Sequence, residues 1–178
     1  LTQSGDIEIH VAEDKTLSYS GAAVNLGAKT LTMSGKGTFS NTNALRLNNA
    51  SSKLLLSNTA TVNSVSTTAN NSGVDVDQSS TITSLAVGHT TPVSIAAGKT
   101  LSGGITVTAG SIKLGEAGTL ASTVSMSGGT LDADNNLTLS GALSHTGDIT
   151  IDVAENKILT YSGTAINVGA NTITLSGG

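Results

Sequence analysis

Residues 1–36 read LTQSGDIEIHVAEDKTLSYSGAAVNLGAKTLTMSGK, and residues 143–178 read LSHTGDITIDVAENKILTYSGTAINVGANTITLSGG. The two stretches align without a gap, Leu1 with Leu143, and 21 of the 36 positions are identical. Two unrelated low-complexity segments would not keep Gly-Asp, Val-Ala-Glu, Tyr-Ser-Gly and Ser-Gly in one register. A long fixed period is typical of repeat architectures. We therefore predict one long repeat unit over residues 1–142 and the start of the next unit over residues 143–178.

The differences between the two copies predict which way the side chains point. Positions that exchange one aliphatic side chain for another are expected to be buried; they are Val24 with Ile166, Leu26 with Val168, Leu31 with Ile173, and Met33 with Leu175. Positions that exchange polar side chains of different charge are expected to face solvent; they are Glu8 with Thr150, His10 with Asp152, and Lys29 with Asn171. Residues 7–11 then form a strand whose odd positions point inward.

A shorter repeat lies beneath the long one. Alternating segments such as Leu17–Tyr19, Leu45–Leu47, Val74–Val76 and Leu137–Leu139 recur about every seven to eight residues. Their punctuation is Ser-Gly and Gly-Gly, as at 34–35, 103–104, 128–129 and 177–178, and neither Asn-Gly nor Asp-Gly occurs anywhere. Because tight hairpins favour those two dipeptides, this punctuation disfavours a β-sandwich of hairpins. We predict an all-β parallel solenoid with about three short strands per coil of roughly 22 residues, and six or seven coils per long unit.

Composition agrees with a thin aliphatic core and limits the functions. Aromatic residues make up 2% of the chain, there are no cysteines, and the net charge is −4 with charged residues at 11%. A chain with so few cations offers no basic face to nucleic acid, and no apolar run is long enough for membrane insertion. We expect Leu1 to be an internal position of a longer precursor and further units to follow Gly178 in tandem.

The phrases Thr138-Leu139-Ser140-Gly141, Gly-Gly-Thr-Leu at 128–131 and Thr-Ile-Thr-Leu-Ser-Gly-Gly at 172–178 resemble autotransporter-associated β-strand repeats. The chain also resembles the haemagglutinin-like passenger regions of bacterial adhesins. The resemblance implies a right-handed parallel β-helix, export from a bacterium and a role as a stiff stalk or fibre. The long unit of this chain departs from the short period of that family.

Parallel β-helices also carry polysaccharide-degrading enzymes, which need clustered carboxylates. The candidates are the pairs Asp75/Asp77 and Asp132/Asp134, and we predict no catalysis by either, because no arginine lies nearby and the chain contains no tryptophan. Asp75 and Asp77 flank the apolar Val76, so we predict that this pair points outward into solvent. Calcium is a better use for such pairs, yet the glycine-rich nonapeptide of calcium-binding repeats is absent. His10, His89 and His145 are scattered and are predicted to be surface residues. We predict no catalytic, cofactor or metal site.

Two surface patterns leave alternatives open. Thr-x-Thr pairs at 30/32, 59/61, 81/83, 106/108 and 172/174 are the motif of ice-binding solenoids, but their spacing is too uneven for one flat file. The asparagines at 41, 43, 48, 49, 70, 71, 135 and 136 either stack as amide ladders or simply form turns.

From these observations we expect a structural repeat module of a long extracellular or cell-surface bacterial protein, either a shaft or a self-assembling filament. Its expected partners are neighbouring copies or tandem units stacked end to end, and a cell-surface or matrix polysaccharide. A ligand-binding solenoid remains the alternative.

Overall fold

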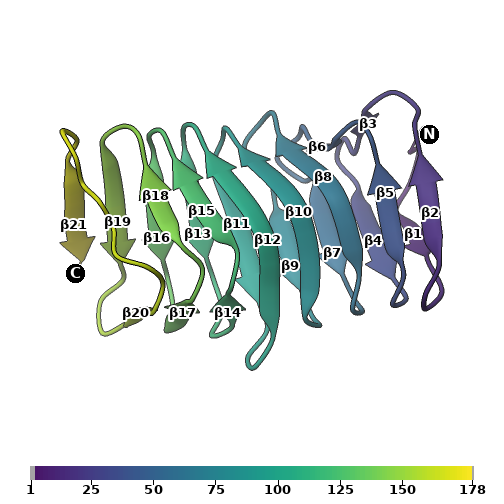
Figure 1. Ribbon diagram of the computed structural model, residues 1–178. Helices are drawn as coiled ribbons and strands as arrows, with labels where there is room; N and C mark the ends of the chain where they lie inside the picture. Colours follow the sequence, from purple (N-terminus) through teal and green to yellow (C-terminus); the bar gives the residue numbers. More distant parts are fainter. Residues whose placement is uncertain (1–2, 178) are drawn as a thin grey trace.

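The computed structural model describes residues 3–177, so the first two positions of the first copy and the corner glycine Gly178 lie outside the described residues. The described chain is built from strands and turns, with no helix among residues 3–177, and therefore with no helical segment that spans a membrane. It coils into a stack of about nine turns with its two ends at opposite ends of the stack (Figure 1). The prediction of an all-β parallel solenoid is confirmed.

One side of every coil contributes a strand to a nine-stranded parallel sheet, which we call sheet A. Its strands, in spatial and chain order, are β1 (Ile7–His10), β4 (Thr30–Ser34), β7 (Lys53–Leu56), β9 (Gly73–Val76), β11 (Thr91–Ile95), β13 (Ser111–Leu114), β16 (Thr130–Ala133), β19 (Ile149–Val153) and β21 (Ile173–Gly177). From β1 to β19, which begin at equivalent positions of the two copies, there are seven steps along this order. One long repeat unit thus makes seven coils.

The remaining strands form a twelve-stranded parallel sheet, sheet B, that bends around the other two sides. Its main path is β2 (Thr16–Tyr19), β5 (Thr38–Asn41), β8 (Thr61–Thr67), β10 (Ser80–Val87), β12 (Thr100–Val107), β14 (Thr119–Leu120), β17 (Leu137–Leu139) and β20 (Leu159–Tyr161). The third side carries β3 (Val24–Asn25), β6 (Leu45–Leu47), β15 (Thr123–Met126) and β18 (Leu143–His145). The predicted unit boundary at residue 142 precedes β18 within this unbroken stack.

The coils that begin with β1, β4, β13 and β16 have the predicted three short strands, whereas the middle coils differ. In the middle coils, the second and third strands merge into β8, β10 and β12, which are 7, 8 and 8 residues long. The register between β10 and β12 shifts between Ile82 and Leu85, which is a β-bulge that bends the strand. Gly103 sits at this bend with φ +118°, and a Cβ there would lie 1.8 Å from the Ile82 carbonyl oxygen. The glycine therefore allows a corner inside a continuous strand.

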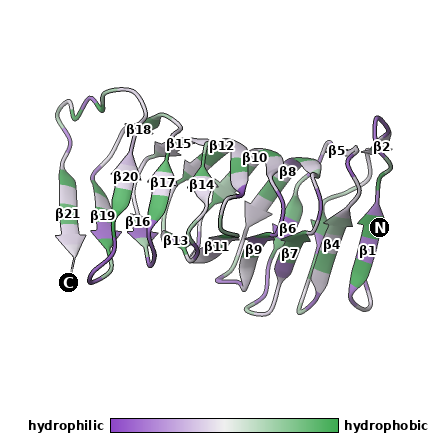
Figure 2. Cartoon of the chain, turned by 90° about the horizontal axis from the view of Figure 1, so that it is seen from below, coloured by the Kyte–Doolittle hydropathy of each residue, from purple (hydrophilic) through white to green (hydrophobic). Residues whose placement is uncertain are grey.

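The core is a column of aliphatic side chains inside the coils. Every second residue of most strands is buried, and apolar and polar residues alternate along them (Figure 2). The aliphatic positions predicted from the first copy are buried: Val24, Leu26, Leu31 and Met33 are each no more than 1% exposed. Coil length varies along the stack, since Ile7 lies in register with Leu31 but Val74 lies in register with Val93. Strand register, and not a fixed period, therefore places one inward residue above the next.

Candidate functional site

The first aspartate of each pair lies on the outer face of sheet A, and the two lie three coils apart, while Asp77 and Asp134 lie in the bends that follow their strands. Asp75 is on β9 and Asp132 is on β16, with β11 and β13 between them. Three steps at the usual distance between neighbouring strands place Asp75 and Asp132 about 14 Å apart. They therefore do not form one carboxylate cluster of the kind that hydrolyses a glycosidic bond.

Each first aspartate of a pair binds a lysine of the preceding coil. Asp75 forms an ion pair with Lys53, and an Asp132 carboxylate oxygen lies 2.8 Å from the Lys113 amine. The carboxylate of Asp132, through its hydrogen bond and its charge, raises the pKa of Lys113 above the ordinary value of 10.5. The predicted solvated pair holds for Asp77, which is exposed, whereas Asp75 is half-buried in its ion pair. Asp132 is likewise half-buried and Asp134 is exposed.

The three histidines are far apart, and one of them points inward. His10 on β1 is exposed and its Nδ1 lies 3.1 Å from the Ser34 hydroxyl. His89 is exposed in the loop before β11. His145, predicted to be at the surface, is 9% exposed, with Nδ1 2.9 Å from the Gly147 carbonyl oxygen. Within residues 3–177, no three metal-ligating side chains come together.

Sheet B carries an outward file of hydroxyls that the sequence analysis did not predict. One threonine of each coil stands directly before an inward residue of the second strand: Thr16, Thr38, Thr61, Thr81, Thr100, Thr119, Thr138 and Thr160. Register pairs Thr16, Thr38, Thr61 and Thr81 in succession, and then pairs Thr100, Thr119, Thr138 and Thr160. The two ranks meet at β10 and β12, where Thr81 pairs with Ser102. The signal in the sequence is a threonine before one inward residue of every coil.

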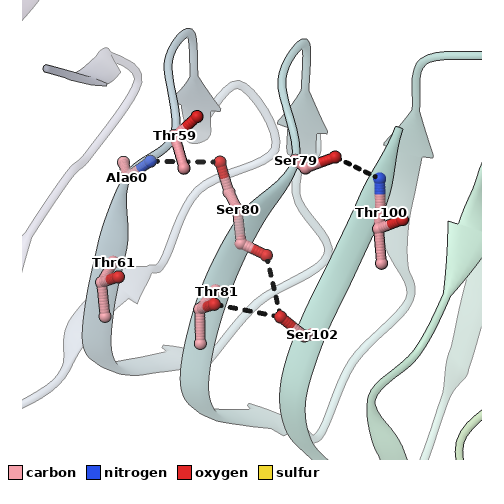
Figure 3. Close-up of a pocket in the computed structure, with 8 residues that line it drawn as sticks. All are labelled: Thr59, Ala60, Thr61, Ser79, Ser80, Thr81, Thr100 and Ser102. Carbon is pink, nitrogen blue, oxygen red and sulfur yellow. Dashed lines mark hydrogen bonds between the residues drawn. The ribbon is translucent and has the colours of Figure 1, made fainter. Parts of the chain in front are cut away.

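A shallow depression of about 340 Å³ lies where these ranks meet (Figure 3). Only Ala60 among its lining residues lacks a side-chain hydroxyl. The Thr81 and Ser102 hydroxyl oxygens are 3.0 Å apart, and the Thr100 amide donates to the Ser79 hydroxyl at 3.1 Å. No charged residue lines the depression. This surface therefore offers neutral hydrogen-bonding groups that are largely bonded to each other and to the backbone.

The Thr-x-Thr pairs are divided among different sides of the coil. Residues 30/32 lie on β4 and residue 174 on β21, both in sheet A, whereas Thr61, Thr81 and Thr83 lie on the first part of the long strands of sheet B. Thr106 lies on the later part of β12. The expectation that these pairs do not form one flat file agrees with this placement.

The asparagines at the corners bond to the backbone of neighbouring coils. Asn41 is buried, its amide donates to the Ser64 carbonyl oxygen at 2.6 Å, and its Oδ1 accepts from the Ser64 amide at 3.1 Å. The Asn48 Oδ1 accepts from the Gly27 amide at 2.8 Å. These bonds satisfy backbone groups that the corners would otherwise leave unpaired. Asn41 and Asn48 therefore join successive coils through the main chain, whereas Asn49 accepts from the Ser51 amide at 3.0 Å within its own turn, as the turn-forming alternative predicts.

No family model, no curated protein and no solved structure matches this chain.

Proposed function

We propose that this chain is a structural module of a long secreted or cell-surface bacterial protein, and that it acts as a stiff shaft. The observation that carries the proposal is the continuity of sheet A from β1 to β21 and of sheet B from β2 to β20. Each coil places aliphatic side chains in the same inward files, so neighbouring coils share one core. A stack of this kind lengthens by adding coils without changing its cross-section.

The bonds between coils support stiffness. The backbone hydrogen bonds of both sheets run along the stack axis, because all strand pairs are parallel and join successive coils. Corner side chains add further links between coils, as from the Asn135 amide to the Gly115 carbonyl oxygen at 3.1 Å and from the Thr90 amide to Asn70 at 3.1 Å. Bending the shaft would stretch these bonds on one side of every coil at once.

The proposed location on a bacterial surface is supported by two phrases of the sequence. The Leu-Thr-Leu-Ser-Gly phrase occupies β17 and its continuation at residues 137–141, and a related phrase occupies β21. This likeness to autotransporter-associated repeats supports export and display on a bacterial surface. Exposed apolar residues at the ends of the stack, Leu17 at 45% and Leu175 at 75%, support self-assembly into a filament.

Electron microscopy of a chain with four tandem copies of residues 1–142 tests the shaft. Seven coils per unit at the spacing of β-strands predict straight rods that gain about 34 Å for each unit. Short rods of the segment 1–178 should also join end to end at high concentration. Flexible strings of separate globules would contradict the shaft, and monodisperse short rods would contradict filament growth.

A contact face for polysaccharide is the second candidate function, and the uncharged hydroxyl depression on sheet B favours it. Glycan-array binding by the native segment, weakened by Thr81→Val with Ser102→Ala, would support that role. The matched control is Asp75→Asn on the opposite sheet, which should leave binding unchanged. We propose no catalysis, and glycan cleavage that disappears in Asp75→Asn or Asp132→Asn would contradict this.

A further inference from the structure

The N-terminal end of the stack presents an apolar surface. A cavity of about 370 Å³ there is lined by Ile9 of β1, by Leu17, Ser18 and Tyr19 of β2, and by Phe39 of the second coil. Leu17 is 45% exposed, and the ring of Tyr19 stacks on that of Phe39 with centroids 6.4 Å apart. We call the surface formed by Ile9, Leu17 and Tyr19 the N-terminal end face.

The second copy of the repeat shows the same surface with its cover in place. Leu159 and Tyr161 of β20 are the equivalents of Leu17 and Tyr19. Strand β17 lies over them, with Leu137 in register with Leu159 and Leu139 in register with Tyr161. On sheet A, Leu131 of β16 lies in register with Ile151, which is the equivalent of Ile9.

Backbone bonds hold this cover in place. The Leu137 amide donates to the Ile158 carbonyl oxygen at 3.1 Å, and the Ser162 amide donates to the Leu139 carbonyl oxygen at 3.0 Å. In the first copy, the equivalent groups are the Thr16 carbonyl oxygen and the Ser20 amide.

The turn before the strand that receives the cover, and the tyrosine hydrogen bond after it, are the same in both copies. Asp14 and Asn156, at equivalent turn positions, both have φ 58°. The Tyr19 hydroxyl donates to the Ala22 carbonyl oxygen, as the Tyr161 hydroxyl does to that of Thr164. The N-terminal end face is therefore already formed in the shape that accepts a strand like β17.

One difference between the copies also favours docking. In the second copy, Asp132 lies in register with Asp152, which places two carboxylates on neighbouring strands. The position equivalent to Asp152 in the first copy is His10. A strand like β16 placed over β1 would therefore meet an imidazole in place of a second carboxylate, which removes a like-charge pair.

We propose that the N-terminal end face is a docking surface for one particular coil, with the chemistry of residues 129–142, supplied by another copy of the long repeat unit. The proposal rests on the shaft function above. It adds which coils meet at the junction between two units: the seventh coil of one unit contacts the first coil of the next. The contact is heterologous, so it propagates along one axis.

An N-terminal extension of the chain tests this proposal. A copy of residues 110–142 placed directly before Leu1 recreates the natural junction between Ala142 and Leu143. Hydrogen exchange at the Ser20 amide should slow by at least about tenfold relative to the unextended segment, because that amide gains a carbonyl partner. The control carries the same extension with Leu137→Asn and Leu139→Asn in the added copy, and it should leave Ser20 exchange unchanged.

A second variant keeps the test decisive. Leu17→Asn in the chain with the native extension should abolish the protection of Ser20, because it places a polar side chain beneath the added leucines. Equal Ser20 exchange in the native and substituted extensions would overturn the docking surface. Straight tandem rods together with that result would leave the shaft function intact, whereas loss of the rods would remove the shaft function itself.

Discussion

The two copies of the repeated segment differ in burial far more than in sequence. In the first copy, Met33 and Leu26 are each 1% exposed, because the next coil covers them with β7 and β6. In the second copy, the equivalent Leu175 is 75% exposed and Val168 is 42% exposed. Residues 24–25 form a strand, whereas the equivalent residues 166–167 do not.

One coil therefore does not determine its own structure. The aliphatic side chains of a coil gain their burial from the coils on both sides, as expected for a solenoid whose stability is a sum of neighbour contacts. Variants at matched positions of the two copies should separate the effect of the cover from the effect of the sequence.

The largest contrast is expected at Leu31 and Ile173. Leu31 is fully buried between β1 and β7, so Leu31→Ala should lower the free energy of unfolding by about 2–4 kcal/mol. Ile173 is half-buried at the open end, and Ile173→Ala should cost less than about 1.5 kcal/mol. Urea denaturation measures both. Equal losses would contradict the role of the cover. Ile9 is half-buried at the other end of the stack, so Ile9→Ala should also lower the free energy of unfolding by less than Leu31→Ala does.

The next contrast concerns Gly35 and Gly177, which are equivalent. Gly35 has φ +82°, and a Cβ there would lie 2.1 Å from the Val11 carbonyl oxygen. Gly35→Ala should therefore cost about 1–2 kcal/mol for the left-handed backbone alone, and more for the clash. The same added atom at Gly177 would lie 2.8 Å from the Val153 carbonyl oxygen, at an exposed strand end. Thermal unfolding should show a larger drop in melting temperature for Gly35→Ala than for Gly177→Ala. A larger drop for Gly177→Ala would contradict the comparison.

Polar bonds that need no cover should be equal in the two copies. Asp6 accepts a bond from the Thr30 amide at 2.8 Å, and Asp148 accepts one from the Thr172 amide at 2.7 Å, both at exposed sites. Asp6→Ala and Asp148→Ala should each cost about 1 kcal/mol. A gap between them greater than about 1 kcal/mol in urea denaturation would show that these bonds also depend on the next coil.

The smallest effects are expected on the charged face of sheet A. Asp132→Asn removes the partner of Lys113, but the lysine side chain is 41% exposed, so the loss should stay below about 1 kcal/mol. Because the pKa of Lys113 is raised in the folded chain, this contribution is complete below its ordinary value of 10.5 and is lost as pH rises through the higher folded value. The stability difference between the native chain and Asp132→Asn should therefore shrink as pH rises above that ordinary value, and a difference that grows there would contradict the sign.

The sequence predicts the inward positions of the first copy well, because alternation and the exchanges between copies report burial directly. The same prediction is wrong for Val168 and Leu175, which are exposed because they lie at the C-terminal end of the described stack. Leu26, Leu31 and Met33 are buried as expected, and Glu8 and His10 are exposed. The merged strands β8, β10 and β12 are not predictable from the spacing of short strands, because a bulge bends the strand without a break in pairing.

The surface contacts are harder to predict, because they depend on which residues stack. Lys53 meets Asp75 and Lys113 meets Asp132 only when the coil lengths are known, and these lengths vary along the stack. His145 points inward. The sequence does not indicate this direction, because His145 and its neighbour Ser144 are both polar. The threonine file is visible in the sequence as one threonine before an inward residue of each coil, but Thr-x-Thr pairs alone do not reveal it.

Disulfide trapping is the sharpest test of the parallel stack, since the chain contains no cysteine of its own. Ser125 and Ser144 are Cα partners on neighbouring coils, as are Ser18 and Ser40 near the other end. Neighbouring strands bring such partners within the Cα separation that a disulfide requires. The double variants S125C/S144C and S18C/S40C should each close quantitatively on mild oxidation, while S94C/S125C, on opposite sheets, should stay reduced. Closure of S94C/S125C with both register pairs left open would contradict the stack.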